Sequence, residues 1–445
     1  MSDIKVNLIS LGCPKNQVDS EHMIFQLQED GMTYCTRPEE ADVVVINTCG
    51  FIENAKREAI ETILETAELK KTGQLKGLVV AGCLPQRYAE DFQKELPEVD
   101  AVLGTGSYTD VVAAVKSAYS GKIYENFDNI DRAEQEVGRV ITTPYYSAYL
   151  KIAEGCDNHC AYCVIPSLRG RYRSRQMADI LAEAQGLLQA GVKEIIVIAQ
   201  DITRYGTDLT GKRMLSELLN KLCEMDFHWI RLHYLYPDEI DDTLIQTIAS
   251  QPKILKYLDI PIQHVNDRIL KSMHRRGNHE YLDTLFTRLR EQIPGVVLRT
   301  SLIVGLPGET DEEFTQLCEF MQKHRIERAG VFTYSPEEGS EAATMPDQID
   351  EDVKSRRQFI LEEIQSGVMD DYNHDHMHQE MEVLCEGYDP EAEMYYGRSY
   401  ADSPDIDGRI YFHAEEEVTL GDFVMVRIDD SREADLIGTA LTRAY

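Results

Sequence analysis

Short apolar runs alternate with amphipathic helical stretches over most of the chain. Continuous apolar runs of this length are typical of strands buried on both faces, and their alternation with helices predicts an open parallel sheet. Residues 1–140 are therefore expected to form an α/β domain. Its four predicted strands are Val6–Leu11, Asp42–Asn47, Gly77–Ala81 and Ala101–Leu103.

A second α/β series follows between residues 141 and 375. Six strand–helix units are fewer than the eight of a closed barrel, so this series predicts a partial (βα)6 barrel with its catalytic face at the carboxyl ends of the strands. In the first helix of the series, Ser174 is the expected N-cap and Gly191 the C-terminal residue. The predicted strands are Tyr149–Ala153, Glu194–Ala199, Trp229–Leu235, Tyr257–Ile260, Val296–Val304 and Ala329–Thr333.

The pattern changes again in residues 376–445. Short apolar runs are separated there by turn residues such as Asp407-Gly408 and Gly421-Asp422, which predicts a small antiparallel β-barrel. The expected strands include Glu382–Cys385, Arg409–Phe412 and Phe423–Ile428.

The charge balance narrows the class of partner. The 445 residues include 45 basic and 78 acidic side chains, a net charge of −33, and the segment from Gln379 to Tyr445 carries 17 acidic and 5 basic residues. Such a charge repels phosphates, disfavours direct nucleic-acid binding and favours a basic partner. The alternative interpretation is an acidic surface that only contacts solvent.

Composition also predicts a compartment. The sequence contains no run of eighteen apolar residues, so we expect no membrane span. The first residues lack the basic and apolar regions of a signal peptide. Ten cysteines, six of them in patterned positions, indicate metal thiolates in a reducing compartment rather than disulfides. We therefore expect a cytoplasmic protein that does not act at a membrane.

Three cysteines share one short loop directly after the apolar segment Ala148–Ala153. Thiolates are the usual protein ligands of iron–sulfur clusters, and three of them leave one iron of a four-iron cluster free for a small molecule. A zinc site needs a fourth ligand, and His159 lies between two of the thiols, where it fits one tetrahedron poorly. The spacing C-x3-C-x2-C therefore predicts an iron–sulfur cluster at Cys156, Cys160 and Cys163.

Three further cysteines each end a predicted strand of the first domain. The carboxyl ends of parallel strands meet at one edge of a sheet, so thiols that are far apart in sequence can converge there. A glycine beside each thiol permits a close approach of the backbone to a bulky group. The pattern predicts a second three-thiol metal site, for which the spacing alone leaves iron–sulfur and zinc open. Its residues are Cys13, Cys49 and Cys83.

Polar residues stand at other strand ends of the predicted partial barrel. The glycines of the turn Gly305–Thr310 permit backbone contact with an adenosine, and Thr310 is expected to cap the next helix. The remaining polar positions are Gln200-Asp201, Arg231, His233 and Gln263-His264. Four arginines either hold a carboxylate or form a solvated basic loop, and they are Arg169, Arg171, Arg173 and Arg175.

The combination of these features resembles the methylthiotransferase family of radical S-adenosylmethionine (SAM) enzymes over essentially the whole chain. The loop motif of that superfamily carries an aromatic residue before its last cysteine, here Tyr162. In the family the small C-terminal barrel is called a TRAM domain. The resemblance implies a radical SAM 4Fe–4S cluster at the three loop cysteines. It also implies an auxiliary 4Fe–4S cluster at Cys13, Cys49 and Cys83.

Within that family, the chain resembles the branch that modifies an aspartate in the twelfth protein of the small ribosomal subunit. The phrases that carry this resemblance are Leu11–Asn16, Gln200-Asp201, Met273–Asn278 and Arg398-Ser399 leading to Ile406–Gly408. The resemblance implies methylthiolation of the aspartate β-carbon, with one SAM for the radical and a second as methyl donor. The alternative is methylthiolation of a tRNA adenosine by the same chemistry.

The resemblance also implies site residues and partners. It implies no catalytic side chain beyond the cluster ligands, and Ala199 departs from the superfamily, much of which has an acidic residue there. The implied partners are the basic ribosomal protein or the small subunit, an electron donor and a sulfur donor. Contacts with SAM are expected from Tyr162, Gln200, Arg231, Ile303 and Gly305.

Overall fold

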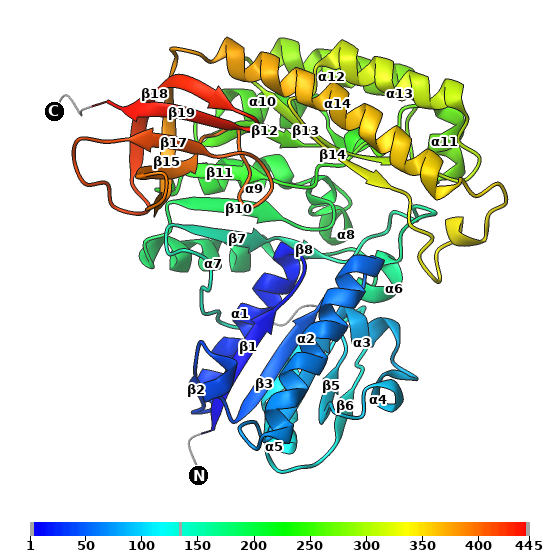
Figure 1. Cartoon of the computed structure of the whole chain (residues 1–445), viewed down its shortest axis with the longest axis vertical. Helices are drawn as coiled ribbons and strands as arrows, with labels where there is room; N and C mark the ends of the chain where they lie inside the picture. Colours follow the sequence, from blue (N-terminus) through cyan, green and yellow to red (C-terminus); the bar gives the residue numbers. More distant parts are fainter. Residues whose placement is uncertain (1–3, 133–135, 442–445) are drawn as a thin grey trace.

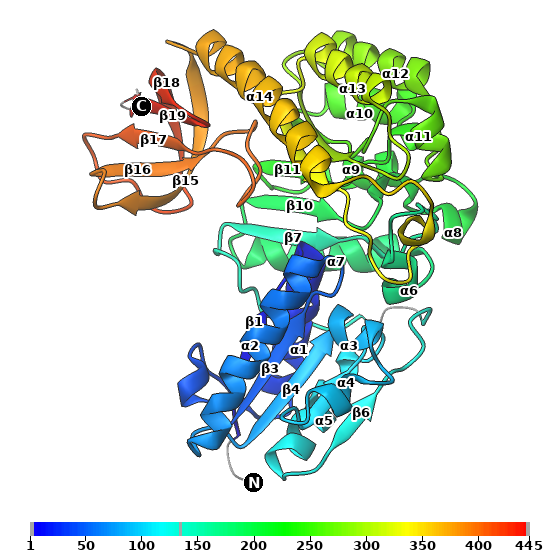
Figure 2. The same ribbon diagram turned by 45° about the vertical axis from the view of Figure 1, so that its right-hand side comes forward.

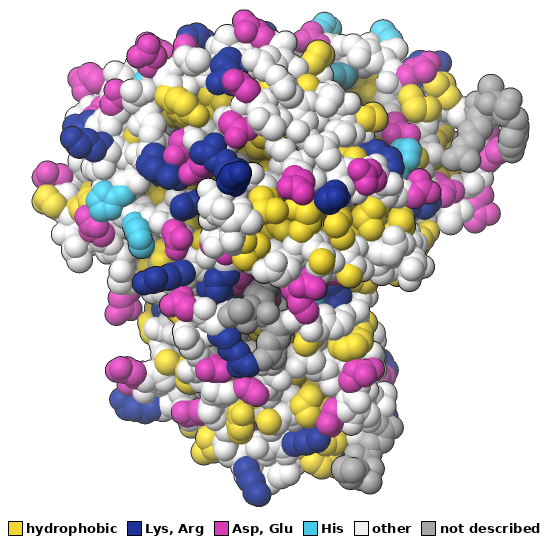
Figure 3. All heavy atoms as spheres, turned by 180° about the vertical axis from the view of Figure 1, so that it is seen from behind, with side chains coloured by type: hydrophobic (Ala, Val, Ile, Leu, Met, Phe, Trp, Pro, Cys, Tyr) yellow, Lys and Arg dark blue, Asp and Glu magenta, His cyan; other side chains and the backbone are white. Residues whose placement is uncertain are grey.

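Three sheets organise the protein into an N-terminal domain, a partial barrel and a C-terminal barrel (Figure 1). The structure is a computed structural model that describes residues 4–132 and 136–441. Seen from behind, the narrower N-terminal domain projects from a wider body, and acidic and basic side chains are interspersed on that face (Figure 3). None of the described helices combines the length and apolar character needed to span a bilayer.

The N-terminal domain is the predicted open parallel sheet, with strand order β2-β1-β3-β4-β5-β6. The four predicted strands are confirmed. The short edge strands β2 and β6 were not predicted, because two or three partly exposed residues carry no apolar signal. The strands are β1 Lys5–Ser10, β2 Thr33–Tyr34, β3 Val43–Thr48, β4 Gly77–Gly82, β5 Ala101–Leu103 and β6 Tyr124–Asn126. The helices are α1 Pro14–Glu29, α2 Glu53–Lys71, α3 Cys83–Arg87, α4 Phe92–Glu95 and α5 Val111–Tyr119.

The second domain is an open six-stranded parallel sheet, which confirms the predicted partial barrel. Its order is β14-β13-β12-β11-β10-β7, and β8 Ala153–Glu154 pairs separately with β9 Arg173–Ser174. The strands of the large sheet are β7 Ser147–Lys151, β10 Glu194–Ile198, β11 Trp229–Leu232, β12 Ile254–Asp259, β13 Val297–Val304 and β14 Arg328–Thr333. The helices are α6 Ile165–Arg169, α7 Met177–Gln189, α8 Thr207–Thr210, α9 Leu215–Cys223, α10 Asp242–Ser250, α11 Asp267–Ser272, α12 His279–Gln292, α13 Asp311–His324 and α14 Glu351–Asp375.

Two helix caps of this domain test the sequence interpretation. Thr310 caps α13 as expected, in a capping box with Glu313. Gly191 lies at φ +93° just beyond α7, as a C-terminal glycine should. Ser174 is not the N-cap of α7: Gln176 takes that position, and the Ser174 hydroxyl hydrogen-bonds to Asp208 instead.

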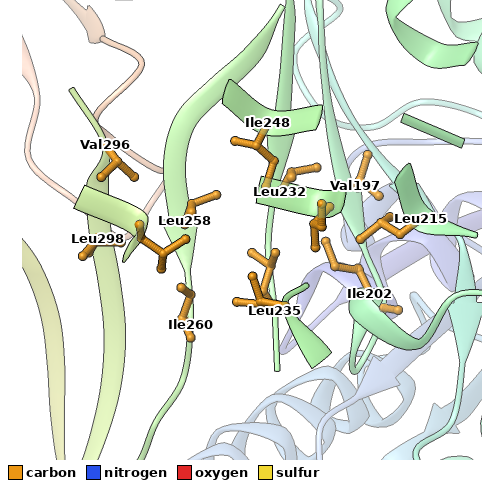
Figure 4. Close-up of a cluster of buried hydrophobic side chains, with 14 of the residues drawn as sticks. Val197, Ile202, Leu215, Leu232, Leu235, Ile248, Leu258, Ile260, Val296 and Leu298 are labelled. Atoms are coloured by element: carbon orange, nitrogen blue, oxygen red, sulfur yellow. The ribbon is translucent and has the colours of Figure 1, made fainter. Parts of the chain in front are cut away.

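The two faces of the large sheet differ in character. Its outer face packs apolar side chains against the surrounding helices (Figure 4), where Leu232 and Leu258 lie in one buried cluster with Ile248 of α10. Its inner face carries buried charged or polar groups such as Glu194 and Arg231. Burial of charge is unfavourable unless each group is paired, so the open interior must be filled by partners from elsewhere in the chain.

The C-terminal barrel is closed, with strand order β15-β16-β17-β19-β18. It lies to one side of the partial barrel, with α14 leading into it (Figure 2). The prediction of an antiparallel barrel needs one correction, because β17 and β19 pair in parallel. The strands are β15 Glu380–Asp389, β16 Met394–Arg398, β17 Ile410–His413, β18 Phe423–Arg432 and β19 Asp435–Ala440.

The loop between β16 and β17, residues 399–409, enters the partial barrel, and we call it the arm. Arg328 Nη2 donates to Asp402 Oδ1 at 2.9 Å, and the Tyr257 hydroxyl donates to Asp407 Oδ2 at 2.6 Å. Burial lowers the pKa of His233 to about 3, so its ring is neutral and pairs with the Ser403 hydroxyl at 3.0 Å. The arm therefore supplies the polar partners that the barrel interior requires.

A buried carboxylate anchors the base of the arm. Glu194 accepts hydrogen bonds from Arg231 Nε at 3.0 Å and from Arg398 Nη1 at 3.1 Å. Arg398 is the last residue of β16, so this ion triad joins the two barrels across a fully buried contact.

Replacing Glu194→Gln is expected to destabilise the protein by about 3–5 kcal/mol, because the buried Arg231 loses its carboxylate partner and Arg398 keeps only Glu386. Thermal unfolding of the iron-free protein measures this. The matched control is Glu382→Gln, which removes only a half-exposed contact with His228. An equal effect of the two substitutions would contradict the anchoring role.

The same triad makes the stability of the protein depend on pH in the acidic range. The two arginines lower the pKa of Glu194 from an ordinary 4.5 to about 2, despite burial. Its contribution to stability is therefore complete above pH 4.5 and is lost as the pH falls toward 2.

Candidate active site

The three N-terminal cysteines meet at the carboxyl edge of their sheet, beyond β1, β3 and β4. A side chain at Gly12 would place its Cβ 2.6 Å from the Cβ of Cys49, and one at Gly50 would lie 2.8 Å from the backbone of Leu84. Only glycine permits this approach of the three loops. Burial raises the pKa of the Cys83 thiol to about 12, and the neighbouring Cys13 and Cys49 act in the same direction.

The three loop cysteines of the partial barrel also lie together, between β8 and α6. The Sγ atoms of Cys156 and Cys163 each accept a backbone N–H, from Asn158 and Ile165, at 3.4 Å. Arg275 Nη1 approaches Cys160 Sγ at 3.8 Å. Burial raises the pKa of the Cys156 thiol to about 11 and that of the Cys163 thiol to about 12, and the hydrogen-bond donors act against this rise. The same donors would stabilise the sulfurs of a bound metal cluster.

The two groups of thiols face one seam between the domains. Cys83 packs in one apolar cluster with Phe51, Val164 and Leu168, and Val164 directly follows Cys163. Helix α3, which begins at Cys83, lies beside α6 in both ribbon views (Figures 1 and 2). Among the described residues, no three His, Cys, Asp or Glu side chains converge tightly enough to hold a single metal ion.

Four buried charges hold this seam closed. Arg169 Nη1 donates to Asp19 Oδ2 at 2.6 Å and to Glu154 Oε2 at 3.2 Å. Lys151 Nζ binds the same two carboxylates, at 2.7 and 3.0 Å. The two cations lower the pKa of both carboxyl groups against the effect of burial. Among the described residues, two cations and two carboxylates thus meet within a buried interface.

An asparagine links this network to the first cysteine loops. Asn16 Nδ2 donates to the carbonyls of Leu11 and Thr48, at 3.0 and 2.9 Å, and its Oδ1 accepts from Arg169. Burial raises the pKa of the Cys83 thiol, and the positive charge of Arg169 opposes this rise. The arginine therefore stands between the N-terminal thiols and the barrel carboxylates.

The arginine-rich loop divides into two kinds of residue. Arg169 and Arg175 are buried and bind carboxylates, Arg175 those of Glu136 and Glu183. Arg171 is exposed. The carboxylate-binding interpretation is thus correct for Arg169 and Arg175, and the interpretation as a solvated loop is correct for Arg171.

The expected SAM contacts lie around the loop cysteines with one exception. Tyr162 and Ile303 pack against the same apolar cluster, which includes Leu306 next to Gly305. The backbone N–H of Gly305 donates to Glu309 Oε2 at 2.6 Å. Gln200 Nε2 donates to Glu154, and its buried Oε1 has no partner among the described residues, so it can accept from a ligand.

Arg231 is the exception. It is fully buried at the other end of the interior, where it binds Glu194 and donates to the carbonyls of Ser399 and Tyr400. These hydrogen bonds use three of the five N–H groups of its guanidinium. The SAM contact expected at Arg231 stays a prediction, and the partners that the structure shows for this residue are groups of the protein.

Sequence interpretation missed several residues of the seam: Asn16, Asp19, Lys151, Glu154 and Arg275. A signal existed for two of them, since Lys151 lies within a predicted buried strand and Glu154 directly follows it. A charge in such a position needs a partner from another element. Nothing in the sequence shows which element supplies it.

Two clefts open onto the thiols. One of about 510 Å³ is lined by Gly12, Cys13 and Pro14, by Tyr149 of β7 and by Asp405 of the arm. Another of about 490 Å³ adjoins Cys156, with His159 and Arg171 in its wall. Each group of thiols is thus reachable from outside.

Comparison with known proteins assigns all three domains. The chain matches the models of the Uncharacterized protein family UPF0004 over residues 5–104, the Radical SAM superfamily over 150–321 and the TRAM domain over 379–441. It is 51% identical to the ribosomal protein uS12 methylthiotransferase RimO of Lachnoclostridium phytofermentans, over 98% of this chain and 100% of that protein. It is 48% identical to the protein of the same name from Geobacter sulfurreducens, over 98% and 99%.

A solved structure shares the fold at low identity. The radical SAM methyltransferase TsrM from Kitasatospora setae, with cobalamin and a 4Fe–4S cluster bound, superposes with a TM-score of 0.55 at 14% identity. The match covers 75% of each chain.

The charge network predicts that Arg169→Met destabilises the contact between the two domains by about 3 kcal/mol, because Asp19 and Glu154 lose a buried counter-charge. Denaturant unfolding of the iron-free protein measures this without interference from cluster loss. Arg171→Met is the matched control, since its side chain is exposed two residues away. A loss no larger than that of the control would contradict the role of Arg169.

Proposed function

The chain belongs to the family of ribosomal protein uS12 methylthiotransferases. From this premise we propose that it attaches a methylthio group to the β-carbon of an aspartate in uS12, as a radical SAM enzyme. The observation that carries the proposal is the pair of three-thiol groups on one interdomain seam, with Cys83 packed against Val164, the neighbour of Cys163. The clefts beside this seam open onto both groups, so one bound substrate can meet both without leaving the protein.

The ligand sets follow from this arrangement. We assign the radical SAM 4Fe–4S cluster to Cys156, Cys160 and Cys163 and the auxiliary 4Fe–4S cluster to Cys13, Cys49 and Cys83. When bound, the two groups supply the electron that opens SAM to a carbon radical and the place from which sulfur is delivered. This chemistry is needed because the β-carbon of aspartate is too inert for acid–base catalysis.

The protein's own part is to position SAM and the substrate and to exclude water from the site. Backbone N–H groups hold the sulfurs of Cys156 and Cys163, and Arg275 stands by Cys160. Buried ion pairs close the seam, which strengthens every polar contact inside it. We propose that SAM lies against Tyr162, Ile303 and Gly305, with the unpartnered Oε1 of Gln200 accepting from its amino group.

The partners follow from the same chemistry. The substrate is basic, which suits an enzyme of net charge −33. An electron donor must reduce the radical SAM site, and a sulfur donor must replace the sulfur that leaves with each product. We propose that all of these meet the enzyme in the cytoplasm.

The function is tested on cells that lack this chain. The intact mass of uS12 is expected to fall by one methylthio group, while the methylthio-adenosine content of tRNA from the same cells stays unchanged. The reverse result would leave the chemistry standing and move the substrate to tRNA, against the charge argument.

Substitution of single cysteines tests whether the two thiol groups serve separate steps of the reaction. Cys160→Ala is expected to abolish SAM cleavage, whereas Cys49→Ala is expected to retain cleavage and lose sulfur insertion. Reductive formation of 5′-deoxyadenosine and the mass of uS12 report the two steps separately. Cys223→Ala, at a thiol outside both groups, is the control. Sulfur insertion by Cys49→Ala would overturn the scheme.

A further inference from the structure

One buried arginine lies directly against a cysteine of the radical SAM loop. Arg275 is 8% exposed, and its Nη1 donates to the Sγ of Cys160 at 3.8 Å. Cys160 is the buried member of its group, whereas Cys156 and Cys163 are partly exposed. The Tyr236 hydroxyl lies 3.9 Å from the same sulfur, and its ring carries the Arg275 guanidinium at 4.2 Å from the centroid. The sulfur of Cys160 thus has two polar side chains directed at it, one of them a cation.

The segment that carries this arginine is tied to the cysteine loop on both sides of Cys160. The N–H of Ala161 donates to the Met273 carbonyl, and the His274 ring donates to the carbonyl of His159, both at 3.1 Å. His274 lies at φ +56°, in the left-handed region that a bulky side chain rarely adopts, so the surrounding contacts must maintain this turn. These contacts fix the position of the guanidinium relative to the sulfur.

The charge of Arg275 has no carboxylate partner among the described residues. Asp238 acts on it without forming an ion pair, and the arginine that follows binds this carboxylate at 2.8 Å. Burial raises the pKa of the Tyr162 and Tyr236 phenols, so both rings are neutral. The other group that acts on the guanidinium is the Cys160 thiol, which becomes an anion when it binds iron. The anion that Arg275 faces is therefore the sulfur ligand set itself.

A cation in this place has a direct effect on electron transfer. Reduction adds one negative charge to an iron–sulfur cluster, so a fixed positive charge beside the cluster favours the reduced form. Hydrogen bonds to the ligand sulfurs act in the same direction. Both effects are stronger in a buried site than in water, because the surroundings screen them less.

We infer that Arg275, supported by the ring of Tyr236, raises the reduction potential of the radical SAM cluster. This inference rests on the cluster assignment of the proposed function and adds the residue that makes this cluster reducible. One electron passes from the electron donor to the cluster, and the guanidinium keeps its protons throughout. The auxiliary thiols lie on another domain and have a cation of their own, Arg169, so the effect of Arg275 is confined to one cluster.

The test is a reductive titration of the holoenzyme with dithionite, followed by EPR spectroscopy. The signal that changes when SAM is added reports the radical SAM cluster, and the signal that does not change reports the auxiliary cluster as an internal reference. In Arg275→Met, the ratio of reduced to oxidised radical SAM cluster at a fixed potential is expected to fall at least about tenfold, which corresponds to about 59 mV for one electron.

Two matched variants separate charge from packing. Arg275→Lys keeps the positive charge, and its ratio should stay within about threefold of that of the wild-type protein. Lys271→Met removes an exposed charge from the same segment, and its ratio should not change, because solvent screens that charge. The potential of the auxiliary cluster should be the same in all four proteins.

Three results would overturn the inference. The first is a ratio in Arg275→Met that stays within about threefold of the wild-type value. The second is an equal fall in Arg275→Met and Arg275→Lys, which would assign the effect to packing. The third is loss of iron from the radical SAM site in Arg275→Met, which would assign the arginine to retention of the cluster. Absence of any SAM-dependent EPR signal in the wild-type protein would instead refute the proposed function.

Discussion

Six parallel strands curve but do not close, and the open interior that results is lined with charges that require partners. Eight strands would fill a barrel with their own side chains, whereas here the inner face presents Glu194, Arg231 and His233. The arm of the C-terminal barrel runs through part of the interior, from Arg328 at the start of β14 to His233 just beyond the end of β11. Helix α1 of the N-terminal domain meets the carboxyl ends. The arm and helix α1 both depend on the partial barrel for their position, because each supplies partners for charged groups of the same interior.

This constraint explains why the thiols are arranged as they are. The loop thiols follow the carboxyl end of the first strand of the partial barrel, and the arm reaches the cleft beside Cys13 through Asp405. Arg169 and Lys151 hold Asp19 of α1 against that end, and the same helix starts at Cys13. The contact that assembles the domains is thus also the contact that brings the second group of thiols to the first. A substitution that disrupts this contact therefore changes both the stability of the fold and the geometry of the site.

The sequence predicted the parts of this arrangement that local pattern determines. Apolar runs gave the strands of both sheets, and the position of Cys13, Cys49 and Cys83 at strand ends gave their convergence, because parallel topology fixes which ends meet. The parallel pairing of β17 with β19 was missed, since alternation does not encode strand order. The protein partners of Arg231 were missed for a related reason. Polarity shows that a strand residue needs a partner, whereas depth along the barrel decides whether that partner is a ligand or the protein itself.

The first turns of α1 combine four tasks within seven residues. Cys13 faces the other thiols, Lys15 contacts the ring of Tyr234, Asn16 ties the cysteine loops together, and Asp19 joins the barrel. Residues four apart share one face of a helix, so Lys15 and Asp19 both point to the seam. Asp19 is bound by Lys151 and Arg169 of the partial barrel, so the same short segment carries one thiol of the N-terminal group and the ion pairs that join the two domains. A change in the position of α1 would therefore move that thiol together with the domain contact.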